Sequence, residues 1–205
     1  MNYPETPKGK LEQFGIVGLT DAELLSLLLP VQGKAPAAQR ACQMLSEYGG
    51  LTATARQTKI PAVLAAMEIA RRALAETLRA QDCMSCPAAI RDWLRLTYAN
   101  NERESFMLIT LDAQNRVLKS HMLFYGTLTQ TSVYPREVVK QSLADNAAAV
   151  VFAHNHPSGV AEPSHADEVL TQCLKQALAL VDIRVMDHFI VAGSSAMSFA
   201  ERGLI

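Results

Sequence analysis

The sequence predicts a mixed α/β (α+β) domain, in which helices flank a central mixed sheet, preceded by a small all-helical module. Residues 20–80 show helical periodicity and helix end signals, with no segment typical of a strand. From residue 104 onwards, short apolar runs alternate with helical patterns, an order that favours layered strands and helices. The 205 residues are 49% hydrophobic and 19% charged, enough for a small unit beside a medium one. We therefore assign residues 1–82 to the helical module and residues 83–205 to the α/β domain.

The helical module is predicted from its caps and breakers. The first 18 residues are rich in proline and glycine, and we expect them to be irregular. Thr20 and Glu23 form a capping box at the start of a leucine-rich helix, which should be buried on most sides and which ends at Pro30. Gly49 stops the next helix. The predicted helices cover residues 20–29, about 37–48 and about 60–80.

The α/β domain is predicted to begin after a linker at residues 83–87. Asp112–Asn115 has the composition of a hairpin turn between two apolar runs. Pro135 suits the first position of a helix. The predicted strands cover residues 104–111, 116–124, 129–134, 147–153, 183–186 and 189–191, and the predicted helices cover residues 88–98 and begin at 135 and 164.

Two histidines follow the apolar run at residues 147–153. Side chains alternate along an extended segment, so His154 and His156 point the same way if the strand continues to them. Ser164 and Asp167 have the spacing of a helix cap, which places the Asp167 carboxylate in the first helical turn. Two imidazoles at a strand end and one carboxylate at a helix start can therefore converge on one point.

These three side chains suit a zinc ion. Zinc binds nitrogen and oxygen ligands at ~2.0–2.2 Å, and three protein ligands leave a fourth position for water. A water molecule bound to zinc ionises near neutral pH and becomes a nucleophile. The alternative is that His154 and His156 are structural and that Asp167 only caps its helix. The complete spacing of His154, His156, Ser164 and Asp167 favours the metal site.

The spacing His-x-His, seven residues, Ser, two residues, Asp resembles the metal motif of the JAMM (MPN+) metallopeptidases. The fuller string, from His154 to Gly159 and on to Asp167, resembles the RadC family. Further motifs of the resemblance stand at Tyr134–Val138, Asp187-His188 and Ser198–Gly203. The resemblance implies a JAMM/MPN-like fold for residues 83–205 and a zinc-dependent hydrolase that acts on peptide or isopeptide bonds in a peptide or protein substrate.

The resemblance also implies two catalytic residues. JAMM enzymes carry a glutamate at the head of an early strand, where it moves a proton as general base and then as general acid. Glu102 and Glu104 both stand near that place, and Glu104 is favoured because it directly precedes the apolar strand. The serine that matches Ser164 supports the developing oxyanion in JAMM enzymes, in addition to capping its helix.

The other polar residues near the motif have structural interpretations. If strand alternation holds, Asn155 points away from the metal. His121 and His188 lie on or beside predicted strands and are predicted to be hydrogen-bonded structural histidines, whereas His165 is predicted to be exposed. Cys83 and Cys86 lack a second cysteine pair, so we expect reduced thiols there.

Charge and composition limit the partners. The net charge is −1, and neither half of the chain is basic enough to predict strong phosphate binding. RadC relatives usually carry a helix-hairpin-helix element in the N-terminal module, but residues 51–60 contain no glycine to form its turn, and Arg56 and Lys59 remain as phosphate contacts. This element is therefore degenerate, and a helical cap that packs on the catalytic domain or on a partner is the favoured interpretation.

Two alternatives to the hydrolase stay open, and a compartment is expected. The first alternative is a DNA repair or DNA-processing accessory that binds nucleic acid; the second is a non-catalytic MPN-like scaffold. The N-terminus shows no signal peptide, and no apolar run is long enough to span a bilayer. We therefore expect a cytoplasmic protein without a membrane partner.

Overall fold

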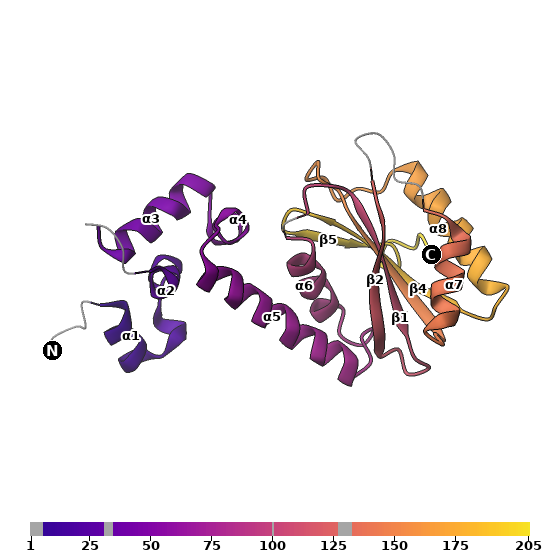
Figure 1. Ribbon diagram of the computed structural model, residues 1–205, viewed down its shortest axis with the longest axis horizontal. Helices are drawn as coiled ribbons and strands as arrows, with labels where there is room; N and C mark the ends of the chain where they lie inside the picture. Colours follow the sequence, from indigo (N-terminus) through magenta and orange to yellow (C-terminus); the bar gives the residue numbers. More distant parts are fainter. Residues whose placement is uncertain (1–5, 31–34, 100, 127–132) are drawn as a thin grey trace. The chain divides into compact units, whose positions relative to one another are not determined.

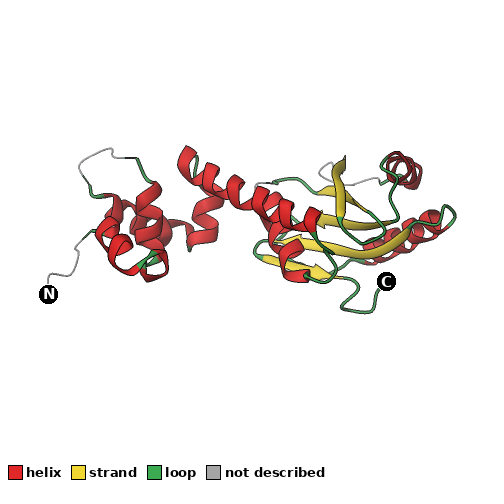
Figure 2. Ribbon diagram, turned by 90° about the horizontal axis from the view of Figure 1, so that it is seen from below, coloured by secondary structure: helices red, strands yellow, loops and turns green. Residues whose placement is uncertain are grey.

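The computed structural model describes residues 6–30, 35–99, 101–126 and 133–205. The chain divides into two compact units, Met1–Ala70 and Arg71–Ile205, which are described separately below. The boundary predicted from the sequence, after residue 82, stays a prediction. Figure 2 shows that the described strands all belong to the second unit and that the first unit is helical. Within the described residues, no helix has both the length and the apolar character needed to cross a membrane.

The first unit consists of short helices around a small apolar core. This core is formed by Leu25, Leu29, Ala41 and Val63, with partly buried neighbours packed against them. The elements are α1 (Pro7–Phe14), a 3-10 turn η1 (Ile16–Gly18), α2 (Asp21–Leu28), α3 (Ala37–Tyr48), α4 (Leu51–Gln57) and the start of α5 (Pro61–Ala80).

The predicted capping signals of this unit are confirmed. Thr20 and Glu23 form the capping box of α2, and Gly49 ends α3 with a φ of 82°, a conformation that glycine adopts without strain. The expectation that α2 is buried on most sides is confirmed, because Leu25, Ser26 and Leu29 are buried and Leu24 and Leu28 are half-buried; among its leucines only Leu27 is exposed, at 40%.

Two helices of the first unit were not predicted. The N-terminal residues expected to be irregular contain α1, because the Thr6 hydroxyl accepts a hydrogen bond from the backbone N–H of Gly9 and caps the helix. Helix α4 is too short for its periodicity to be recognised. The link from α4 to α5 has no residue with positive φ among the described residues 51–60; the hydroxyl of Thr58 accepts a hydrogen bond from the backbone N–H of Ile60 instead.

The second unit is a mixed sheet with helices on both faces, as predicted, and the sheet of the described residues has five strands. The strand order is β2-β1-β3-β4-β5, and β3 and β4 form the parallel pair of this sheet, whereas the other neighbours are antiparallel. Figure 1 shows α6 on one face of the sheet and α7 and α8 on the other. The elements are α6 (Pro87–Thr97), β1 (Ser105–Leu111), β2 (Val117–Tyr125), α7 (Pro135–Ala144), β3 (Ala149–Asn155), α8 (His165–Ala179), β4 (Arg184–Ala192) and β5 (Ser195–Ser198).

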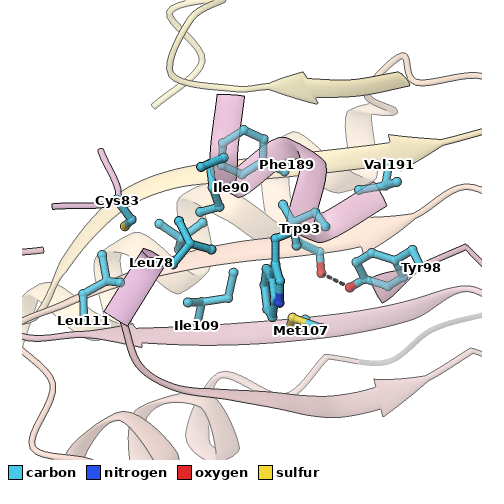
Figure 3. Packing of buried hydrophobic residues seen from close by; sticks show 14 of the residues in the cluster. Leu78, Cys83, Ile90, Trp93, Tyr98, Met107, Ile109, Leu111, Phe189 and Val191 are labelled. Carbon is cyan, nitrogen blue, oxygen red and sulfur yellow. Dashed lines mark hydrogen bonds between the residues drawn. The ribbon is translucent and has the colours of Figure 1, made fainter. Parts of the chain in front are cut away.

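The middle strand β3 is buried on both faces, so its alternating side chains feed two cores. Val151 and Ala153 face α6 and belong to the same apolar cluster as Trp93. Figure 3 shows Trp93 among other residues of this cluster. Val150 and Phe152 face α7 and α8. On the α6 face, the buried Tyr98 hydroxyl donates a hydrogen bond of 2.8 Å to the backbone carbonyl of Ala153. Packing on both faces therefore fixes the position and the direction of β3 within the sheet.

The end of the chain differs from the prediction. The two strands predicted at residues 183–186 and 189–191 are one strand, β4, which carries an irregularity at Met186. Strand β5 was not predicted, because its four residues are too few for a visible alternation. The strand predicted at 129–134 falls mainly on residues 127–132, outside the described part of the chain, and the described Val133 and Tyr134 are not in a strand.

Candidate metal centre

The two histidines of the motif meet one carboxylate at the end of the middle strand. His154 is on β3, and the backbone N–H of His156 donates to the carbonyl of Val191, so the β3–β4 ladder continues one residue beyond the strand. One ligand atom from each of His154, His156 and Asp167 lies within 4.8 Å of the others. The Nε2 atoms of the histidines are 2.9 Å apart, and Asp167 oxygens lie 3.3 Å from Nε2 of His154 and 3.6 Å from Nε2 of His156.

The predicted cap brings the carboxylate to this point. The hydroxyl of Ser164 accepts a hydrogen bond from the Asp167 backbone N–H, and the Asp167 carboxylate accepts one from the Ser164 backbone N–H at 2.8 Å. The hydroxyl also donates to Oδ2 of Asp167 at 2.6 Å. Ser164 is therefore beside the candidate ligands, and its exposed hydroxyl is within reach of a molecule bound there.

The electrostatics of the site favour a cation. Burial on its own would raise the pKa of the Asp167 carboxyl, but the neighbouring imidazoles of His154 and His156 outweigh it and hold this pKa far below its usual range. The hydrogen bond with Asp167 raises the pKa of His156, although burial opposes this. The ionised carboxylate therefore faces two imidazole rings, and its charge would stabilise a cation bound between them.

The donor set fits zinc. Two imidazole nitrogens and one carboxylate oxygen form a ligand type found at catalytic zinc sites, and three protein ligands leave room for a water molecule. The Nδ1 atoms of both rings have other partners: Nδ1 of His156 lies 2.9 Å from the carbonyl oxygen of Val160, and Nδ1 of His154 lies 2.8 Å from Nε2 of His188. Each ring therefore presents Nε2 to the site.

A β-strand irregularity brings His188 into contact with the site. Val150 pairs with Val185, but Val151 pairs with Asp187, so Met186 is an additional residue in β4. One extra residue reverses the faces of the side chains that follow. His188 consequently pairs with Phe152 on the face of α7 and α8, where its ring centroid lies 4.8 Å from that of His154.

His188 is hydrogen-bonded on both ring nitrogens, as predicted for a structural histidine. Besides its contact with His154, its Nδ1 lies 2.7 Å from the hydroxyl of Thr171 on α8. Its burial is complete and holds its pKa well below the usual value. Sequence reasoning missed its contact with a candidate ligand. The available signal was the position of Thr171, four residues after Asp167, because this spacing places a polar side chain on the same face of the helix as the candidate ligand.

The register of the sheet favours Glu104 over Glu102 as the acidic residue beside the site. Phe106 pairs with His154, so continuing this antiparallel register places Glu104 opposite His156, on the same face as the candidate ligands. Glu104 is half-buried and its charge helps to raise the pKa of His156, whereas Glu102 is exposed. The structure thus brings Glu104 to the edge of the site.

Asn155 points to the opposite face, as predicted, and holds the segment before β1. Its Oδ1 accepts hydrogen bonds of 2.9 Å from both the backbone N–H and the hydroxyl of Ser105. Its Nδ2 donates to the carbonyl of Arg103 at 3.0 Å and to that of Asn101 at 3.4 Å. These bonds span the residues on either side of Glu104 and tie them to β3.

The remaining histidines are away from the candidate ligands. His121 on β2 lies 2.5 Å from Asp145, which also bonds to Lys119 and Thr110, so it has the structural partner predicted for it. His165 is exposed, as predicted.

The fold and the convergent side chains define an α/β protein with a candidate His-His-Asp metal centre at the end of its middle strand. The model of a RadC-like JAB domain matches residues 84–204, and the chain therefore belongs to the RadC-like JAB domain family. The UPF0758 proteins of Thiobacillus denitrificans and Nitrosospira multiformis are 51% and 52% identical to it. Both alignments cover 98% of this chain, with 97% and 96% of the respective relatives.

Proposed function

We propose that the protein is a zinc-dependent hydrolase that cleaves peptide or isopeptide bonds. The observation that carries this proposal is the convergence of His154, His156 and Asp167. The β1–β3 register, extended by two residues, sets Glu104 opposite His156 and supports it. The bond class is supported by the spacing of the motif, which resembles that of the JAMM metallopeptidases.

Each residue has a distinct role in the proposed reaction. Zinc, when bound, supplies a Lewis acid that lowers the pKa of a water ligand towards neutrality. Glu104 accepts a proton from the attacking water and returns it to the leaving amine, as a general base and then a general acid. The Ser164 hydroxyl turns from the Asp167 carboxylate, 2.6 Å away, to donate a hydrogen bond to the substrate carbonyl oxygen as negative charge develops on it.

The position of Glu104 provides a matched control. Glu102 has the same charge and lies two residues earlier, but it is exposed. Glu104→Gln should reduce turnover by about 100-fold or more, as expected for loss of a general acid–base group, and should keep zinc bound. Glu102→Gln should leave turnover within about twofold. Equal losses in the two variants would remove Glu104 from its proposed role.

One screen tests the function itself. The zinc-loaded protein is offered peptide, isopeptide-linked and nucleic-acid substrates, with and without a chelator, and zinc content is measured beside that of His156→Ala. We expect chelator-sensitive cleavage of a peptide or isopeptide bond and loss of zinc in the variant. Equal zinc in both proteins would refute the metal centre. Zinc binding without turnover would favour the scaffold alternative, and DNA binding that weakens steeply with salt would favour the nucleic-acid alternative.

A further inference from the structure

We infer that His188 and Thr171 are positioning residues that fix the tautomer of His154 and so keep its Nε2 free for a metal ion. The inference rests on the proposed function only in that it concerns the same metal centre. Three hydrogen bonds carry it. They link the Asp167 carbonyl to Thr171, Thr171 to His188, and His188 to His154, at 2.6, 2.7 and 2.8 Å.

The direction of these hydrogen bonds follows from the first of them. The backbone carbonyl of Asp167 can only accept, so the Thr171 hydroxyl donates its hydrogen there. The hydroxyl then accepts from Nδ1–H of His188, which leaves a lone pair on Nε2 of that ring. This lone pair accepts from Nδ1–H of His154. A neutral His154 with its hydrogen on Nδ1 has its lone pair on Nε2, directed at the site.

The opposite direction is unfavourable, and it would also block the metal position. If the Thr171 hydroxyl donated to His188, two oxygen atoms would lie 2.6 Å apart with no hydrogen between them. His154 would then carry its hydrogen on Nε2, where it would point at the metal position and block coordination.

Packing holds the rings in this arrangement. Thr171 and His188 are fully buried, and His154 is 3% exposed. Phe199 stacks on the His188 ring with centroids 4.7 Å apart, and the Phe152 ring meets it edge-on at 5.8 Å. Because both rings are buried, water does not replace the hydrogen bond between His154 and His188. Asp167 is therefore linked to the centre twice, through its carboxylate as a candidate ligand and through its carbonyl as the first acceptor of the series.

Nitrogen NMR of ¹⁵N-histidine-labelled full-length protein reads the tautomers directly, without any substrate. In the metal-free protein at about pH 8, above the usual histidine pKa, we expect His154 and His188 both to carry hydrogen on Nδ1. A hydrogen on Nε2 of His154 would overturn the inference. Because this measurement needs neither zinc nor turnover, an inactive protein with the expected tautomers would contradict the proposed function and leave the inference standing.

Zinc affinity, measured by competition with a chelator, tests the consequence. Thr171→Val keeps the side-chain shape and removes the hydroxyl, and it should weaken zinc binding by about 10–100-fold and change the His188 tautomer signal. The control Thr171→Ser keeps the hydroxyl and should stay within about threefold of the wild-type affinity. Unchanged affinity and unchanged tautomers in Thr171→Val would refute the role.

A second pair keeps the test valid if Thr171→Val does not fold. His188→Phe keeps an aromatic ring against Phe199 and removes the acceptor, whereas His188→Gln retains an amide oxygen that can accept from Nδ1–H of His154. We expect zinc affinity to fall by about 10–100-fold in His188→Phe and by a smaller factor in His188→Gln. Equal affinities in the two variants, with the His154 signal unchanged, would contradict the inference.

Discussion

Removing the Asn155 side chain should destabilise the second unit strongly, although this residue is not a candidate ligand. Asn155→Ala eliminates two hydrogen bonds of 2.9 Å from Ser105 and one of 3.0 Å to Arg103. A neutral hydrogen bond contributes roughly 0.5–1.5 kcal/mol, and a buried donor left without a partner costs roughly 1–3 kcal/mol. The buried N–H of Ser105 becomes such a donor. With about 1–3 kcal/mol for this donor and about 0.5–1.5 kcal/mol for each of the other two bonds, the free energy of unfolding should fall by about 2–6 kcal/mol.

Urea denaturation followed by tryptophan fluorescence measures this effect in the correct unit. The chain has one tryptophan, Trp93, which is 4% exposed in the core of the second unit. A chelator in all samples prevents bound metal from masking the change. Asn101→Ala is the control, because it removes one partly buried hydrogen bond to Ser105 and should cost less than about 1 kcal/mol. A loss below about 0.5 kcal/mol in Asn155→Ala would refute the reasoning.

Three further predictions concern the metal, the cap and the acidic pH range. Removing zinc with a chelator should lower the melting temperature; at free zinc about 100 times its Kd the linkage is about 2.7 kcal/mol, and an unchanged melting curve would argue against a metal bound by the folded state. Ser164→Ala should reduce kcat by about 10²–10³-fold, but should lower the free energy of unfolding by only about 1 kcal/mol, as steady-state kinetics and denaturation will show. Asp145→Asn should cost roughly 1.5–3 kcal/mol near neutral pH, because the covered carboxylate bonds to Lys119, His121 and Thr110. Burial alone would raise the pKa of Asp145, but these bonds lower the pKa by more, to below its usual 3.8. The stabilisation is therefore present above pH 3.8 and is lost as pH falls through the folded-state pKa. The difference in melting temperature between the wild type and Asp145→Asn should become smaller in acid.

Local signals in the sequence predicted much of the fold. The cap at Ser164 is set by side chains three residues apart, and the hairpin turn before β2 by four consecutive residues, so both are visible in a short window. Strand β3 is visible because burial on both faces makes it a continuous apolar run. The motif from His154 to Asp167 belongs to this class of signal, which is why the candidate ligands could be named.

Apart from α1, which has a local cap at Thr6, the parts that were missed depend on contacts between distant residues. The irregularity at Met186 leaves no pattern in β4, yet it decides that His188 faces α8. The polar pair Asp187-His188 interrupts the apolar run, so one strand was predicted as two. Helix α4 and strand β5 are too short to show a period and are held by their neighbours. Sequence reasoning therefore located the candidate metal ligands and missed that His188 and Thr171 contact them.

The separation between His154 and His188 has a consequence for biosynthesis. The chain leaves the ribosome from its amino end, and His188 follows His154 by 34 residues. A nascent chain therefore exposes both candidate histidine ligands and Asp167 before β4, the parallel neighbour of β3, has emerged from the ribosome. Any cation captured at that stage meets an imidazole that is still free to rotate. The candidate centre reaches its final arrangement only after β4 and Phe199, which stacks on His188, have emerged and folded.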